Sequence, residues 1–196
     1  MDFAWIFGRV QRLLFSPASE WDAIAGEAAD VQKTYMNYVG PLVIAAAVAS
    51  AIGMSVVGVY GFRFGIGTAF TGMIVQIVMG LVTVYVLAFV INALAPQFGA
   101  TPDMGQAFKV AAYSPTASWV AGLVMIIPAL GVLAILGALY SLYLLYVGLP
   151  KLMKPAQDKA MVYTLAVIGV MIVIAIIMGA IQASMMPAMT PMMRSY

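Results

Sequence analysis

The sequence contains no cysteine and no histidine. Without cysteine there can be no disulfide framework, no thiolate zinc site and no thiol nucleophile. Without histidine the chain also lacks the most common metal ligand and the most common general base. These absences exclude most metal-dependent and acyl-transfer chemistry. We therefore expect a non-enzymatic protein with no metal site and no cofactor.

Charge is the second scarce feature. Only 8% of the 196 residues are charged and 64% are hydrophobic, whereas about 25% of the residues in a soluble domain are charged. Nine basic and seven acidic side chains could not cover a water-soluble globule of this length. The net charge of +2 is also too small to attract a nucleic acid. The composition predicts an all-α integral membrane protein with one compact domain and no nucleic-acid partner.

The charged residues separate long uncharged segments, which locate the membrane helices. Gaps of 29, 39, 41 and 34 uncharged residues follow Lys33, Arg63, Lys109 and Lys159, and about 20 residues suffice to cross the hydrocarbon core. As one helix the 41-residue gap would be about 60 Å long, twice the core thickness. Pro128 near its middle favours a hairpin instead. The five predicted spans are residues 38–60, 70–95, 111–127, 130–148 and 161–183.

The basic residues orient these spans, because lysine and arginine accumulate in cytoplasmic loops. With five spans and the N-terminus inside, seven basic residues lie inside and two outside. The inner set is Arg9, Arg12, Lys33, Lys109, Lys151, Lys154 and Lys159, and the outer set is Arg63 and Arg194. A single crossing of the long gap would give five to four and no clear orientation. We predict an inside N-terminus and an outside C-terminus.

Residues 1–33 are predicted to form an amphipathic helical segment at the cytoplasmic interface, ahead of a membrane domain at 34–184. A helical projection places Arg9 and Arg12 off a single apolar arc, which is formed by Phe3, Ile6, Phe7, Val10, Leu13 and Leu14. Ser16 and Pro17 suit the N-cap and first position of a second helix. Its acidic residues are expected to be solvated: Glu20, Asp22 and Glu27.

Two interpretations of this segment stay open. The two helices either pack beneath the bundle as a lid or contact lipid and partners. The candidate contact residues are Phe3, Phe7, Val10, Leu14 and Trp21, together with Lys151, Lys154 and Lys159 after the fourth span. The three lysines either serve topology alone or bind anionic headgroups, at about 1 kcal/mol each.

None of the predicted spans contains an ionisable Asp, Glu, Lys or Arg, which argues against a pump or a proton-coupled transporter. Neutral polar groups remain, among them Gln76 and Ser141, and they need partners in hydrocarbon. They either form interhelical hydrogen bonds or line a polar crevice for a headgroup or solute. The candidate lining residues are Tyr85, Asn92, Tyr113, Tyr140 and Tyr143.

Two weaker patterns are stripes of small residues in two of the spans and a Met-rich C-terminal tail. Small residues recur every fourth position, in Ala45, Ala49 and Gly53 and again in Ala175, Gly179 and Ala183, which suits close packing within the bundle or between chains. Residues 185–196 form a Met-rich tail with two prolines on the predicted outer side. Its thioethers suit Cu(I) in principle, but copper carriers also use His or Cys, so an extended tail is expected.

Several motifs in order resemble the Yip family of Ypt/Rab-interacting membrane proteins, and here its bacterial branch. They are Ser16-Pro17, Trp21, Gly40-Pro41-Leu42, Tyr113-Ser114-Pro115, Trp119, Pro128-Ala129-Leu130-Gly131, Tyr140–Lys154 and Asp158-Lys159-Ala160. The resemblance covers nearly the whole chain. It implies a five-span bundle, and its eukaryotic members act in vesicle traffic, bind Rab GTPases and form complexes with one another.

Two departures argue against a Rab-type partner here. Only about 33 residues precede the first span, and Asn37 and Tyr38 stand where eukaryotic members carry an acidic residue. The leading expectation is a polytopic protein of the bacterial cytoplasmic membrane that serves as a membrane-organising scaffold or partner-binding protein. Its expected partners are lipids, other membrane proteins or a second copy. The alternative is a lipid or small-solute transporter without ion-coupling residues.

Overall fold

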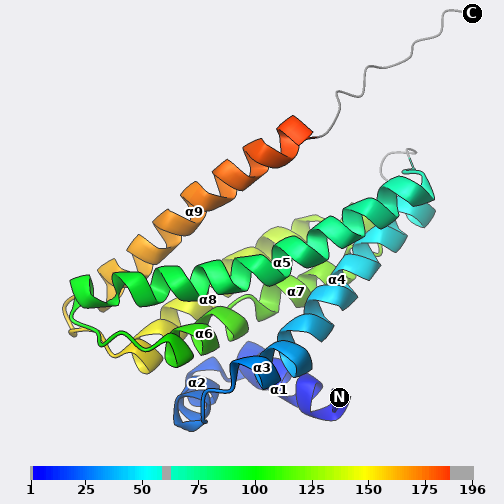
Figure 1. The fold of residues 1–196 in the computed structure, drawn as a ribbon. Coiled ribbons are helices and arrows are strands. Elements are labelled where there is room, and N and C mark those ends of the chain that lie inside the picture. Colours follow the sequence, from blue (N-terminus) through cyan, green and yellow to red (C-terminus); the bar gives the residue numbers. More distant parts are fainter. Residues whose placement is uncertain (1, 59–62, 186–196) are drawn as a thin grey trace, which may run out of the picture.

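The computed structural model describes residues 2–58 and 63–185, and this part of the chain is helical with no strand (Figure 1). The nine α-helices are α1 (Phe3–Phe15), α2 (Pro17–Gly26), α3 (Val31–Thr34), α4 (Gly40–Ile52), α5 (Ile66–Leu94), α6 (Met104–Tyr113), α7 (Thr116–Val124), α8 (Val132–Met153) and α9 (Ala160–Met185). Two π-helical turns, Tyr35–Val39 and Gly53–Val57, extend α4 at its two ends. Short 3₁₀ turns lie at Ala95–Phe98 and Pro128–Leu130.

Four helices are long and apolar enough to cross a membrane. They are Val31–Val57, Ile66–Phe98, Val132–Met153 and Ala160–Ile177. At most 39% of the most apolar 18-residue window of any of them is buried inside the protein. Their outward surfaces carry exposed Val, Ile, Leu and Phe, as expected where lipid is the solvent. These helices overlap four of the five predicted spans.

The third predicted span, residues 111–127, does not form one continuous helix. It begins near the end of α6, which stops at Tyr113, and continues as the nine-residue α7. Pro115 lies at the break because it has no backbone N–H to donate and its ring clashes with the preceding turn. The predicted hairpin at Pro128 is present, between α7 and α8. The structure therefore confirms an all-helical membrane protein with four candidate spans, but not the count of five.

Small residues bring the bundle helices close together. A Cβ added to Gly53 would lie 2.0 Å from the backbone oxygen of Met125, at the turn before α8. A Cβ on Gly137 would lie 2.4 Å from the Cβ of Ala121. Ala49 is also buried, so part of the first small-residue stripe packs inside the bundle. Of the second stripe, Ala175 is exposed and the side chains at 179 and 183 lie outside the description.

Gly53→Ala should therefore destabilise the bundle by about 1–3 kcal/mol, because the new methyl group meets rigid backbone. The matched control is Gly169→Ala in α9, where no atom lies within 4 Å of the added Cβ. That change should be neutral or stabilising by up to about 1 kcal/mol, because alanine favours helix. Thermal unfolding of both variants in the same detergent compares them, and equal stability would contradict the packing of α4 on this turn.

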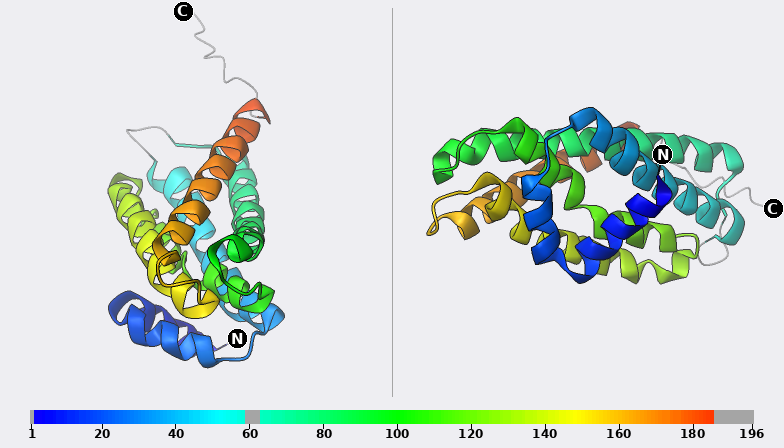
Figure 2. Two further views of the ribbon diagram at one scale, coloured as in Figure 1. Left: turned by 90° about the vertical axis from the view of Figure 1, so that its left-hand side faces the viewer. Right: turned by 90° about the horizontal axis from the view of Figure 1, so that it is seen from below.

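The first two helices lie across one end of the bundle, beneath α3, α6 and α8 (Figure 1). Viewed from below, α1 and α2 meet at an angle and lead through α3 into the first long helix (Figure 2). At the other extreme, α9 starts beside α5 and α8 and then diverges from them (Figure 1). Among the α9 side chains that the structure describes, the buried ones lie near its start: Tyr163, Thr164 and Val167. The predicted Met-rich tail beyond Met185 lies outside the described residues.

Candidate functional site

Buried charged side chains connect α1 to α2 and to the bundle. The Arg9 guanidinium donates from Nη1 to Glu20 Oε1 at 2.8 Å and from Nη2 to Glu27 Oε1. Arg12 Nε donates to the second oxygen of Glu20 at 2.7 Å. Arg9 and Glu20 are each only 4% exposed. The expectation that Glu20 is solvated is therefore wrong, because its buried carboxylate pairs with the buried Arg9 and the partly exposed Arg12.

Arg9 also lies over two aromatic rings. Its guanidinium carbon is 5.1 Å from the centre of the Trp5 ring and 5.5 Å from that of Tyr113. Burial acts to lower the pKa of Arg9, but the hydrogen bond to Glu27 and the nearby Glu20 outweigh it, so the pKa is raised overall. Arg9 therefore keeps its charge, and the charge is held between carboxylates and ring faces.

Three donors from the bundle bind backbone oxygens of the first two helices. Lys109 Nζ donates to Ile24 O at 2.7 Å and to Glu27 O at 2.8 Å. The Tyr140 hydroxyl donates to Leu14 O at 2.5 Å, and Lys151 Nζ donates to Ala18 O and to the Asp22 carboxylate. Burial lowers the pKa of Lys109, and nearby Glu27 and Asp103 partly offset this effect. Leu14 lies in the last turn of α1 and Glu27 caps the end of α2, where helical carbonyls lack intrahelical partners.

Trp21 is the apolar anchor of α2. It is fully buried, and its indole lies so close to Gly148 of α8 that an added Cβ would be 2.4 Å from Cε2. Its ring also meets Tyr113 edge-on, with centroids 6.3 Å apart. Trp21 and Gly148 both belong to the motifs that carry the family resemblance. Sequence reasoning named Trp21 as a surface contact and had no signal that it pairs with Gly148 across 127 positions.

The outward face of α1 is aromatic rather than charged. Phe3, Phe7 and Phe15 are 70%, 63% and 82% exposed, while Ile6, Val10 and Leu13 on the other side are buried. The predicted apolar arc is thus divided between protein and surroundings, with Leu14 half-buried at its edge. Among the predicted contact residues, Phe3 and Phe7 are free to meet lipid, whereas Val10 and Trp21 are occupied by packing. The outward face of α2 has only small or polar residues, such as Ser19 and Ala23.

The three lysines after the fourth span differ in their surroundings. Lys151 is paired with Asp22 and half-buried, while Lys154 and Lys159 are exposed. Lys151 and Lys154 line a cavity of about 330 Å³ together with Asp103 and Gln106. The Gln106 side-chain oxygen is buried there and has no hydrogen-bond partner among the described residues. Sequence reasoning named the two lysines but had no signal for Gln106.

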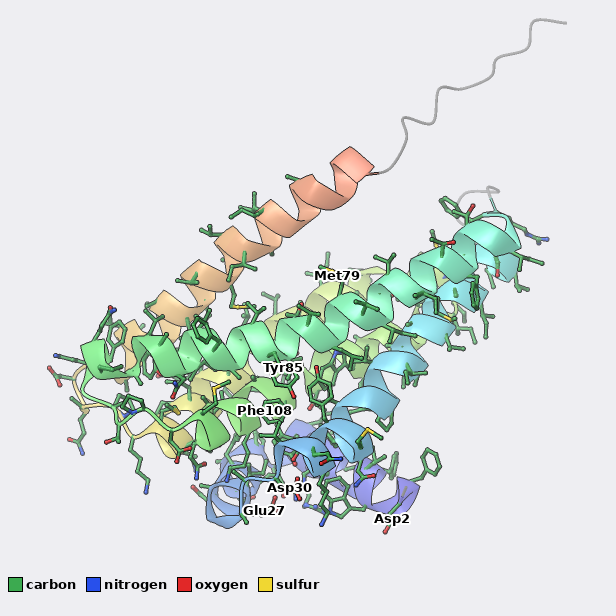
Figure 3. The ribbon with its side chains drawn as sticks, in the orientation of Figure 1. Asp2, Glu27, Asp30, Met79, Tyr85 and Phe108 are labelled. Carbon is green, nitrogen blue, oxygen red and sulfur yellow. The ribbon has the colours of Figure 1, made fainter. Side chains whose placement is uncertain are left out.

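The candidate intramembrane lining residues do not gather around one crevice. Tyr85 packs on Tyr35 and Phe108 (Figure 3), and the rings of Tyr140 and Tyr143 contact each other along α8 at a tilt of 58°. Asn92 is half-buried on α5, and its side-chain oxygen has no partner in the described part of the chain. Neither of the two cavities described here is lined by any of these four candidates, Tyr85, Asn92, Tyr140 and Tyr143. Ser141 instead bonds the hydroxyl of Ser118 at 2.9 Å, which is an interhelical hydrogen bond.

Tyr113 is the exception, because it forms part of a cavity of about 720 Å³ between α1 and α3. Asp2, Glu27 and Asp30 lie at this end of the molecule (Figure 3) and also line it, as do Arg9 and Lys33. Asp2 and Asp30 each accept a backbone N–H at the start of a helix, from Trp5 and Lys33. The cavity therefore has both signs of charge, and much of that charge is already engaged.

The four apolar helices and the docked N-terminal pair define an all-helical membrane protein. The model of the Yip1 domain matches residues 12–178, and the chain belongs to this family. The match begins within α1 and includes Trp21, Gly148 and the four candidate spans. Comparison with curated proteins and with solved structures gave no significant match.

Proposed function

We propose that this protein is a non-enzymatic scaffold of the bacterial cytoplasmic membrane that holds α1 in the interface of the inner leaflet. The observation that carries the proposal is the orientation of α1. Its buried Arg9 turns toward carboxylates of the protein, while Phe3, Phe7 and Phe15 turn outward. An exposed aromatic face without a charge is suited to the boundary between headgroups and acyl chains. The ion pairs behind it would keep the helix from rotating.

This proposal includes five crossings, with the end of α6 (residues 111–113) and α7 together as a broken span. A helix interrupted by proline is tolerated in a membrane where neighbouring helices cover the freed backbone groups. Both α6 and α7 pack on α8, and Ala107–Tyr113 and Thr116 are buried. Five crossings keep the basic residues at seven inside and two outside. The N-terminus, and α1 with it, then meets the inner leaflet.

Anionic lipids would add to the contact. Lys154 and Lys159 are exposed at the same end of the bundle as α2, and each cation near an anionic surface contributes about 1 kcal/mol. Fixed to the bundle, an aromatic helix and these lysines would form one rigid surface toward lipids and other membrane proteins. A Rab-type GTPase is not an expected partner.

The depth of α1 can be measured directly, because the natural chain contains no cysteine. Phe7→Cys, labelled with an environment-sensitive fluorophore in lipid vesicles, should emit at shorter wavelength and resist quenching by aqueous iodide at least about threefold better than an exposed site. The physical reason is that the label at this position enters a region of low polarity. Vesicles with and without anionic lipid test the lysine contribution.

The matched control is Ala23→Cys on the outward face of α2, which is exposed but has no aromatic neighbours on that face. Its label should be quenched freely. Equal quenching at both sites would contradict the proposed placement of α1 in lipid.

A further inference from the structure

Gln76 lies unpaired on the membrane-facing surface of α5. It is exposed and follows Ile66, the first residue of α5, by ten residues, so it lies about 15 Å along the helix and inside the predicted span 70–95. Within the part of the chain whose side chains are described (residues 2–58, 63–177 and 180), no hydrogen bond satisfies its amide. An amide left unpaired in hydrocarbon costs several kcal/mol.

Two other exposed polar side chains of the same helix bond their own backbone. The Thr71 hydroxyl donates to Gly67 O at 3.0 Å and the Thr83 hydroxyl donates to Met79 O at 2.7 Å. Each bond returns to the preceding turn of α5. Gln76 is the exposed amide of α5, and its two donors and its acceptor are available to a partner outside the described chain.

The face around Gln76 permits close approach by another helix. Gly72 is four residues before it and Thr83 seven residues after it, so the three share one side of α5. Gly72 and Thr83 are exposed, and no atom lies within 4 Å of a Cβ added to Gly72. Figure 1 shows α9 diverging from α5, so α9 does not close over this half of the helix. Small residues flanking a polar one are typical of interfaces between membrane helices.

We propose that two copies of the chain associate through this face of α5, with Gln76 bonding Gln76. An amide is both donor and acceptor, so two identical amides satisfy each other across a two-fold axis. Two copies inserted with the same orientation place their Gln76 amides at the same depth in the membrane. An unrelated partner need not have an amide at that depth. Lipid acyl chains could cover the face but could not pair the amide. This surface is separate from α1 and does not depend on the proposed function.

The absence of cysteine makes the interface testable by cross-linking, because one introduced cysteine can join only to another chain. In native membranes, oxidised Gly72→Cys should yield a band at twice the mass of the 20.8 kDa chain. The control is Val78→Cys, which is 51% exposed and lies about 200° around the helix from Gln76. It should remain a single chain. A band of another mass, equal yields at both sites, or no cross-link at Gly72→Cys would overturn the proposal.

A second measurement removes the amide itself. Energy transfer between labelled chains in vesicles of increasing lipid content gives the association constant, and Gln76→Leu should weaken association about tenfold. Gln97→Leu, which alters an exposed glutamine in the turn after α5, should leave it unchanged. Because Gln76 is exposed, its replacement should not lower the unfolding temperature of the detergent-solubilised chain. Association of Gln76→Leu as tight as that of the natural chain would overturn the role of the amide.

Discussion

Trp21→Ala should reduce the free energy of unfolding by about 3–5 kcal/mol. The indole is fully buried between α8 and Tyr113, and its removal leaves a cavity that Gly148 has no side chain to fill. The change should also release the first two helices from the bundle, since Trp21 is the largest buried side chain of α2. Thermal unfolding in detergent measures the first effect, and limited proteolysis near residues 26–30 measures the second.

Two comparisons make this result specific. Phe15→Ala removes an aromatic ring that is 82% exposed, so it should leave stability in detergent almost unchanged. Gly148→Ala alone should destabilise the protein, because its Cβ would lie 2.4 Å from the indole. In the Trp21→Ala background the same change should cost less, because the space is now empty. Additive effects of the two changes would mean that Trp21 and Gly148 do not touch.

Glu20→Gln should cost about 3 kcal/mol, because it breaks two ion pairs at once and leaves the buried Arg9 with Glu27 alone. The matched control is Asp22→Asn on the same helix. Asp22 pairs with Lys151, but its side chain is 67% exposed, and exposed pairs contribute about 0–1 kcal/mol. Unfolding in detergent compares the two variants, and a similar loss in both would show that the Arg9 network is not buried from solvent.

The double variant Arg9→Met with Glu20→Met separates charge from packing. Replacing both members of a buried ion pair by apolar side chains is often neutral, whereas removing one member strands the other. The double variant should therefore be more stable than Glu20→Gln. It should also allow α1 to rotate, so the Phe7 label in lipid would lose part of its protection from iodide. If the Phe7 label in that variant were still fully protected from iodide, the apolar contacts of α1 alone would set its orientation.

The local sequence signals succeeded where one short segment decides the structure. Pro128 produces the hairpin between α7 and α8, and Pro17 occupies the first position of α2 after Ser16. The Ser16 hydroxyl, however, makes no capping bond. The same rule applied to Pro115 would have divided the third predicted span. The charge gaps placed the other spans because membrane helices are defined by length and apolar content, which one sequence contains.

Contacts between different helices could not be predicted from these local signals. An arginine that lies off an apolar arc is expected to be solvated. Here α2 folds back against α1 and brings Glu20 and Glu27 to Arg9, so Arg9 pairs with carboxylates instead of water. From the sequence, Trp21 has the features of an interfacial side chain. In the structure its indole packs on the backbone of α8 at Gly148. The candidate site therefore contains residues that the sequence named, in environments that the sequence did not reveal.

By itself the sequence determined that this is an apolar, helical membrane protein, since sixteen charges and no cysteine or histidine allow little else. It also determined the approximate positions of four long helices and, through its motifs, the Yip1 family. Only the tertiary structure decided that α1 turns Arg9 inward and Phe3, Phe7 and Phe15 outward, and that the amide of Gln76 stays uncovered. The reason is that periodicity defines the faces of a helix, whereas the neighbours of each face come from other helices, from Glu20 in α2 for Arg9 to Gly148 in α8 for Trp21.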